Sequence, residues 1–178
     1  MIAAPSINPA VTTENRLTRR HVGLDEIAAL AAVLARAAQP GDVITLSGGL
    51  GAGKTTFARF FIQALAVNTG GDAQEEVPSP TFTLVQVYER DPAPVWHFDL
   101  YRITRAEDAY ELNIEEAFEV GISLIEWSER LGALLPSDRL DVHLETEPGD
   151  EEAASTRALT LSAYGAWASR LGDICKDV

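Results

Sequence analysis

Apolar positions recur along the chain with helical spacing in some stretches and with strand-like runs in others. Residues 25–38 place apolar side chains every three or four positions and begin with Asp25, so they predict an amphipathic helix capped by that aspartate. After Asp42, the residues of 42–46 are β-branched or apolar, and they predict a short buried strand. Residues 55–65 return to helical spacing. This alternation of helix and strand predicts an α/β fold.

The second half of the chain continues the alternation. Residues 84–88 and 95–100 predict two strands joined by a hairpin turn. Residues 104–118 are acidic and predict a mostly helical segment. The remaining predicted elements are strands at 122–125, 140–145 and 157–161, a short edge strand at 18–22, surface loops at 68–76 and 147–155, and a terminal helix whose apolar stripe is Tyr164, Trp167, Leu171 and Ile174. That stripe favours docking on the same domain over a partner surface.

Length and composition fit a single domain spanning residues 1–178. The chain is 46% hydrophobic, which is enough to bury a substantial core. Residues 1–17 are polar and contain prolines, and they predict a loose N-terminal arm. No segment resembles a signal peptide or a membrane span, and Cys175 is the only cysteine, so no disulfide can form within one chain. These features predict a soluble cytoplasmic protein with no membrane contact.

The charge of the chain argues against direct binding to nucleic acid. The formal net charge is −13, and the basic residues are scattered, with Arg19–Arg20 as their longest cluster. Proteins that grip nucleic acid neutralise several phosphates with grouped lysines and arginines. Any role in RNA biology is therefore expected to run through a partner that contacts the RNA.

The stretch at 48–55 reads Gly-Gly-Leu-Gly-Ala-Gly-Lys-Thr and satisfies the phosphate-loop pattern G-x-x-x-x-G-K-[ST]. Glycines allow successive backbone N–H groups to point into one concavity that cradles phosphates. Lys54 adds a positive charge, and the Thr55 hydroxyl is suited to binding the Mg²⁺ that bridges the phosphates. The expected nucleotide-binding residues here are Gly49, Leu50, Gly51, Ala52, Gly53, Lys54, Thr55 and Thr56.

The context of this loop supports a nucleotide site. A predicted strand precedes it and a predicted helix follows it, which is the arrangement that the motif requires. Lys54 is one of only two lysines in the chain. The chain lacks the N-K-x-D pattern that reads guanine, so ATP is favoured over GTP.

A second loop, at 78–83, has hydroxyl groups between two prolines. The prolines predict an extended path. The residues alone leave two interpretations open: Thr81 and its neighbours reach the γ-phosphate or its magnesium, or the loop is a rigid turn into the next strand. His97 and His143 stand singly in predicted strands, where histidines are usually packed or hydrogen-bonded rather than metal ligands.

Nucleoside triphosphatases use an acidic residue at the end of a second strand to hold or orient magnesium. Asp99 ends the predicted strand at 95–100, and Glu126 follows the more apolar run at 122–125. Spacing alone does not rank these two carboxylates.

Four short segments together form a pattern more specific than the phosphate loop. They are Gly-Leu-Gly-Ala-Gly-Lys-Thr-Thr-Phe (49–57), Ser-Pro-Thr-Phe-Thr-Leu-Val (79–85), His-Phe-Asp-Leu-Tyr-Arg (97–102) and Ile-Glu-Trp (125–127). In this order they strongly resemble the TsaE family, small ATPases of bacterial tRNA threonylcarbamoyladenosine synthesis. The resemblance covers roughly residues 22–161.

The resemblance implies a three-layer α/β P-loop NTPase fold with a mixed central sheet. Carried over by position, Lys54 and Thr55 bind phosphate and magnesium, and the loop that contains Thr81 is a switch-like element. Asp99 matches the functional aspartate of the family, and Glu126 matches its magnesium carboxylate.

The resemblance also implies partners. Family members act with the proteins TsaD and TsaB, which install threonylcarbamoyl on the adenosine beside the anticodon of tRNAs that read A-initial codons, so tRNA contact would be indirect. Trp127 matches the family tryptophan. Relatives often carry an acidic residue where this chain has Gly49, but a phosphate cradle built from backbone does not need that side chain.

Two other functions remain compatible with a phosphate loop. A small-molecule kinase would need a basic lid, and no arginine-rich segment is present. A nucleotide-gated assembly factor with incidental hydrolysis would look the same in sequence. No arginine is committed by sequence to the γ-phosphate, since Arg59 lies on the loop helix and Arg102 and Arg130 follow the two acidic strand ends.

Overall fold

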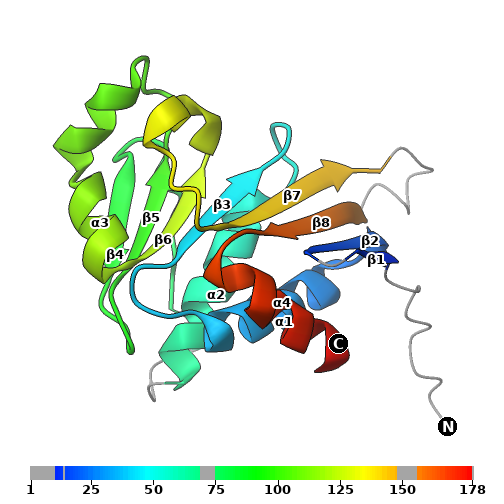
Figure 1. Cartoon of the computed structure of the whole chain (residues 1–178). Helices are drawn as coiled ribbons and strands as arrows, with labels where there is room; N and C mark the ends of the chain where they lie inside the picture. The colour runs from blue at the N-terminus through cyan, green and yellow to red at the C-terminus, as the bar shows by residue number, and fades with distance from the viewer. Residues whose placement is uncertain (1–10, 14, 69–74, 148–155, 178) are drawn as a thin grey trace, which may run out of the picture.

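The described residues form one eight-stranded mixed sheet with helices on both faces (Figure 1). The structure is a computed structural model, and it describes residues 11–13, 15–68, 75–147 and 156–177. The strands are β1 (Val11–Thr13), β2 (Arg16–Val22), β3 (Val43–Ser47), β4 (Val85–Tyr88), β5 (Val95–Asp99), β6 (Ile122–Glu126), β7 (Leu140–Thr146) and β8 (Arg157–Ala163). Their order across the sheet is β1-β2-β8-β7-β3-β6-β5-β4.

Four strands at the centre of the sheet run parallel and position the candidate site. β3 pairs in parallel with β6 and with β7, and β5 pairs in parallel with β6. The outer strands are antiparallel to their neighbours. The carboxyl ends of β7, β3, β6 and β5 therefore share one edge of the sheet, where ligands bind in open α/β folds.

The helices form two layers, one on each side of the sheet. One face carries α1 (Leu24–Ala37), α2 (Lys54–Asn68) and α4 (Ala166–Asp177). The other carries the short 3₁₀ helix η1 (Ala106–Leu112), α3 (Ile114–Val120) and the 3₁₀ segment η2 (Ser128–Leu134), packed mainly over β5 and β6. This arrangement confirms the expected three-layer α/β fold with a mixed sheet.

The strands have different hydrophobic patterns because the two helical layers differ in extent. On β3, Val43 packs into the cluster beneath η1 and α3, while Ile44 and Leu46 pack against the opposite layer. β5 and β6 are buried at every position, as strands covered on both faces are. Along most of β7, buried positions alternate with half-buried ones, as expected of the alternating run predicted at 140–145.

The cap predicted for the first helix is wrong. α1 begins one residue before Asp25, and its N-cap is Gly23, whose backbone N–H donates to Glu26 Oε2 at 2.9 Å. Asp25 instead lies in the first turn, where a negative charge is favourable to the helix dipole.

The N-terminal prediction is also wrong in part. β2 begins at Arg16 and lies between β1 and β8, so the segment 18–22 is not an edge strand; β1 is. The loose arm predicted for residues 1–17 does not hold for 11–13 and 16–17, which pair as a hairpin. β2 is held in turn by β8, from the far end of the chain, so no local pattern could show this pairing. Residues 1–10 lie outside the described part of the chain.

The terminal helix α4 docks on its own domain, as predicted. Trp167, Leu171 and Ile174 are buried in the core beside α1 and β8. The prediction that Tyr164 belongs to that stripe is wrong, since Tyr164 precedes the helix and is 43% exposed. Most of the predicted loops at 68–76 and 147–155 lies outside the described residues.

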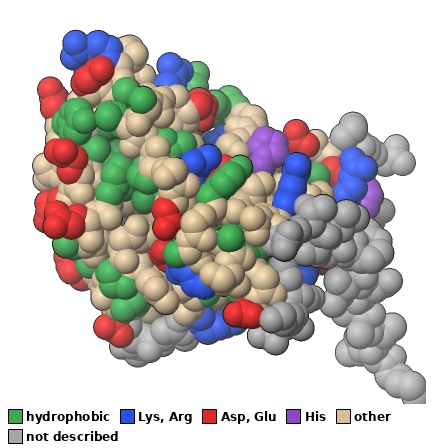
Figure 2. Space-filling model, in the orientation of Figure 1, with side chains coloured by type: hydrophobic (Ala, Val, Ile, Leu, Met, Phe, Trp, Pro, Cys, Tyr) green, Lys and Arg blue, Asp and Glu red, His purple; other side chains and the backbone are tan. Residues whose placement is uncertain are grey.

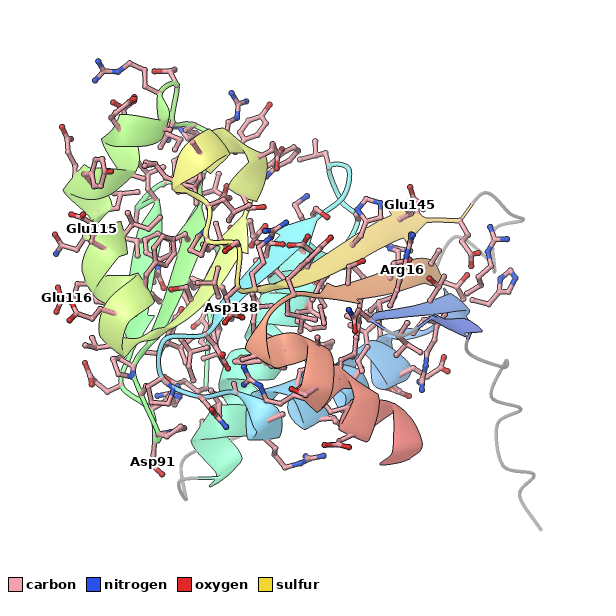
Figure 3. All side chains as sticks on the ribbon, in the orientation of Figure 1. Arg16, Asp91, Glu115, Glu116, Asp138 and Glu145 are labelled. Carbon is pink, nitrogen blue, oxygen red and sulfur yellow. The ribbon has the colours of Figure 1, made fainter. Side chains whose placement is uncertain are left out.

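Acidic side chains spread over the surface that η1 and α3 form, on the left of the view in Figure 2. Figure 3 places Glu115 and Glu116 pointing outward from α3, and both are exposed. Among the described helices, none is long and apolar enough to cross a bilayer.

Candidate nucleotide site

The phosphate loop connects β3 to α2 and has the backbone that its glycines were expected to allow. Gly48, Gly51 and Gly53 have φ values of +133°, +74° and +109°, a region that side chains rarely adopt. At Gly48 the packing adds a second requirement. A Cβ there would lie 2.1 Å from the carbonyl oxygen of Leu144 on β7, so glycine is needed for the close approach of the two strands.

Lys54, the first residue of α2, is held over the loop. Its Nζ donates to the carbonyl oxygens of Gly48 and Gly49, both at 2.9 Å, and it lies 4.2 Å from the ring centroid of Trp127. The residue is only 5% exposed. Trp127 follows β6 immediately and has a left-handed backbone, with φ of +60°. The ammonium group is thus pre-positioned at the mouth of the loop.

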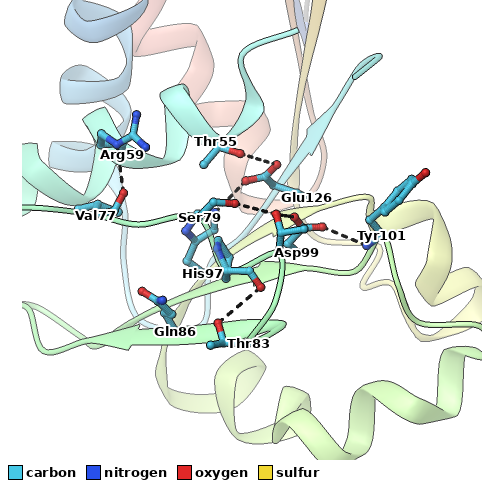
Figure 4. Close-up of polar contacts among 12 residues, drawn as sticks. Thr55, Arg59, Val77, Ser79, Thr83, Gln86, His97, Asp99, Tyr101 and Glu126 are labelled. Carbon is cyan, nitrogen blue, oxygen red and sulfur yellow. Dashed lines mark hydrogen bonds and ion pairs between the residues drawn. The ribbon is translucent and has the colours of Figure 1, made fainter. Parts of the chain in front are cut away.

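Asp99 and Glu126 end two neighbouring parallel strands in register, so their side chains start side by side at the carboxyl edge of the sheet. Both are nearly fully buried. The Thr55 hydroxyl donates to Glu126 Oε2 at 3.0 Å (Figure 4). The Thr81 hydroxyl donates to Asp99 Oδ2 at 2.7 Å. The start of α2 and the loop at 78–83 are therefore each tied to one carboxylate.

The loop at 78–83 is held from several sides. Ser79 Oγ lies 2.8 Å from the Thr81 hydroxyl, and the backbone N–H of Leu84 donates to the carbonyl of Pro80 at 2.6 Å. Just before the loop, Arg59 of α2 donates to the carbonyl of Val77 at 3.1 Å. These bonds make the segment a constrained turn into β4. They also hold the Thr81 hydroxyl group beside Asp99.

These elements surround an open pocket of about 320 Å³. Its lining residues are Leu50, Gly51, Gly53, Lys54, Thr55, Thr56, Thr81, Asp99, Tyr101, Glu126 and Trp127. Nine of these eleven are among the expected site residues. Of the remaining expected residues, Ala52 is buried, and neither it nor Gly49 lines the pocket.

Two residues near the pocket were missed by reasoning from residue patterns. Tyr101 lines the wall with its ring 4.9 Å from that of Trp127, and its backbone N–H donates to Asp99 Oδ1 at 3.1 Å. Its membership of the segment 97–102 was the available signal. Arg157 reaches across from β8 and donates from Nε to the carbonyl of Ala52 at 3.0 Å. No local pattern marks that arginine.

The two strand histidines behave as packed or hydrogen-bonded residues, as expected. His97 is fully buried, with Nε2 3.0 Å from Glu126 Oε1. His143 lies on β7, where its Nδ1 is 2.9 Å from Ser47 Oγ. Neither belongs to a metal-binding cluster, because the described residues hold no group of three or more His, Cys, Asp or Glu side chains that could bind a metal.

The donor atoms at the carboxylate edge fit Mg²⁺. Thr55, Asp99 and Glu126 offer hydroxyl and carboxylate oxygens, which are hard ligands. Magnesium usually takes one or two protein carboxylates and completes its shell with waters and substrate phosphates, so a larger protein cluster is not required.

The chain is similar to known proteins over most of its length. The family model "Threonylcarbamoyl adenosine biosynthesis protein TsaE" matches residues 23–157. The tRNA threonylcarbamoyladenosine biosynthesis protein TsaE of Bacillus subtilis is 35% identical over 164 residues, which cover 92% of this chain and 94% of the relative. That of Rickettsia felis is 40% identical over 121 residues, 68% of each chain. The crystal structure of Bacillus subtilis YdiB superposes with a TM-score of 0.68 at 28% identity, covering 96% of this chain and 97% of the other. The chain therefore belongs to the TsaE family of threonylcarbamoyladenosine biosynthesis proteins.

Proposed function

We propose that this protein is a Mg²⁺-dependent ATPase that acts with TsaD and TsaB in forming the threonylcarbamoyl group on the adenosine beside the anticodon of tRNAs reading A-initial codons. The observation that carries the enzymatic part is the convergence of Lys54, Thr55, Asp99 and Glu126 on one pocket. Membership of the TsaE family supports the pathway.

In this proposal the loop backbone and Lys54 bind the β- and γ-phosphates. Thr55 and Glu126 hold Mg²⁺, which when bound offsets charge on the phosphates. Asp99 lies in register with Glu126 and is assigned to orienting the attacking water. Two loop carbonyls and the Trp127 ring hold the ammonium group of Lys54 at the phosphate loop, so a positive charge lies beside the phosphates that the loop would bind.

Partner dependence is supported by the absence of arginine from the pocket. No arginine in the described part of the chain lines it. Arg59 is engaged with the Val77 carbonyl, and the Arg102 guanidinium lies 5.7 Å from the ring centroid of Phe82. An arginine at the γ-phosphate is worth roughly 10³ to 10⁵ in rate. We therefore propose that the isolated protein is slow and that TsaD and TsaB complete the site or order the Thr81 loop.

The deciding experiment measures steady-state ATP turnover by the protein alone, with TsaD and TsaB, and with both plus tRNA. The proposal expects slow turnover alone and a clear rise with the partners. Full turnover in isolation, unchanged by the partners, would instead favour an independent ATPase or a small-molecule kinase. Nucleotide-dependent assembly with the partners at negligible turnover would favour an assembly factor.

A further inference from the structure

His97 lies on β5 near Asp99 and Glu126, the two carboxylates of the pocket, and it contacts Glu126. It stands two positions before Asp99 on β5, so the two side chains are on the same face of the sheet. Its ring is fully buried, and its Nε2 is 3.0 Å from Glu126 Oε1, the contact drawn in Figure 4. Both carboxylate oxygens of Glu126 are thus hydrogen-bonded, Oε1 to His97 and Oε2 to Thr55.

The hydrogen-bond pattern selects one tautomer of the ring. A carboxylate only accepts hydrogen bonds, so Nε2 must carry the proton that it shares with Glu126. The other ring nitrogen, Nδ1, is buried and has no hydrogen-bond partner. A proton there would be a buried donor without an acceptor, which is costly. His97 is therefore assigned the tautomer with hydrogen on Nε2 and a bare Nδ1.

We infer that His97 is a positioning residue for the magnesium carboxylate. Its Nε2–H fixes Oε1, which turns Oε2 toward Thr55 and the pocket, so that the two proposed magnesium ligands face each other. Partners of this kind behind a metal ligand typically change metal affinity or activity by about 10- to 100-fold when they are removed. The metal part of the inference rests on the proposed role of Glu126; the tautomer does not.

A matched pair of amide variants distinguishes the effect of losing the hydrogen-bond donor from the effect of losing side-chain packing. In His97→Gln, the amide nitrogen of the introduced side chain can occupy the place of Nε2, whereas the shorter amide in His97→Asn falls short of Glu126. His97→Leu removes the donor altogether and keeps an apolar side chain. Binding of a fluorescent ATP analogue is measured against Mg²⁺ concentration and again in excess chelator, with circular dichroism to check folding.

The Mg²⁺ concentration at half-maximal binding should rise about tenfold or more in His97→Asn and His97→Leu. It should stay within about threefold of wild type in His97→Gln, because that variant keeps the donor. Binding in chelator should be unchanged in all three variants. Equal midpoints in the wild type and in folded His97→Asn and His97→Leu would overturn this inference alone. A wild type with no Mg²⁺ dependence would overturn the proposed function and the metal part of the inference together.

Nitrogen-15 NMR of the histidine rings tests the assignment on the wild-type protein without nucleotide. The chain has three histidines, His21, His97 and His143, so the spectrum is simple to assign by substitution. His97 should show a protonated Nε2 and an unprotonated Nδ1. The opposite tautomer would overturn the inference, whatever the variants do.

Discussion

Asp99 and Glu126 lie opposite each other in register across β5 and β6, and each accepts a hydrogen bond from a different threonine. Thr55, which donates to Glu126, belongs to the start of α2 at the phosphate loop. Thr81, which donates to Asp99, belongs to the loop at 78–83. The two carboxylates are adjacent but connected to different parts of the site, which gives a physical basis for dividing their roles.

Asp99→Asn and Glu126→Gln should each lower ATP turnover by at least roughly tenfold, about 1.4 kcal/mol of barrier. Glu126→Gln should also weaken Mg²⁺-dependent nucleotide binding more than Asp99→Asn, because Glu126 is the carboxylate bonded to Thr55. Turnover assays and Mg²⁺ titrations check both points. Glu115→Gln, an exposed carboxylate on α3, is the control. Equal Mg²⁺ affinity in both variants and wild type would contradict the division of roles.

Lys54→Ala and Thr55→Ala should abolish turnover and keep the fold, since both residues sit at the pocket rather than in a hydrophobic cluster. Thr55→Ser keeps the hydroxyl group and should retain turnover. The measurement is ATP turnover beside circular dichroism. Wild-type rates in either alanine variant would show that the loop does not serve hydrolysis.

Three glycines of the phosphate loop should respond differently to alanine in thermal unfolding. Gly48→Ala should destabilise most, by about 1–3 kcal/mol or more, because its Cβ would meet the Leu144 carbonyl. Gly51→Ala should cost about 1–2 kcal/mol, since the space is open but φ is positive.

Gly49→Ala should stay within about 0.5 kcal/mol of wild type, because nothing lies near its Cβ and its φ is not positive. Gly49→Glu should fold equally well, because the space around the added Cβ is open. A larger loss for Gly49→Ala than for Gly48→Ala would mean that the close approach of the loop to β7 is not what these glycines serve.

Thr81→Ala should reduce the rise in turnover caused by TsaD and TsaB, because the Thr81 hydroxyl joins the loop to Asp99. Thr81→Ser keeps that hydroxyl and should respond like wild type. Turnover is compared with and without the partners. A full response in Thr81→Ala would remove this loop from the proposed gating.

The isolated protein should not retain tRNA at physiological salt, since its net charge is −13. A gel-shift assay at micromolar protein tests this, with the TsaD–TsaB complex as the comparison. A discrete, salt-sensitive complex formed by the protein alone would contradict the indirect contact proposed here.

The residue order along the chain is enough to predict the parts of the site whose residues are contiguous. The strand, the glycine loop and the helix from β3 to α2 are contiguous, so their residues and spacing carry the whole phosphate cradle. The strands β5 and β6 could also be predicted, because strands covered on both faces are rich in apolar residues.

Contacts between residues far apart in the chain depend on how the strands pair and pack. Asp99 and Glu126 become neighbours because β5 and β6 pair in parallel, and nothing in either strand states that register. Arg157 reaches Ala52, and β2 finds β8, through contacts between the two ends of the chain. The spacing of residues along the chain cannot predict such long-range contacts, since they form only when the strands take their order in the packed sheet.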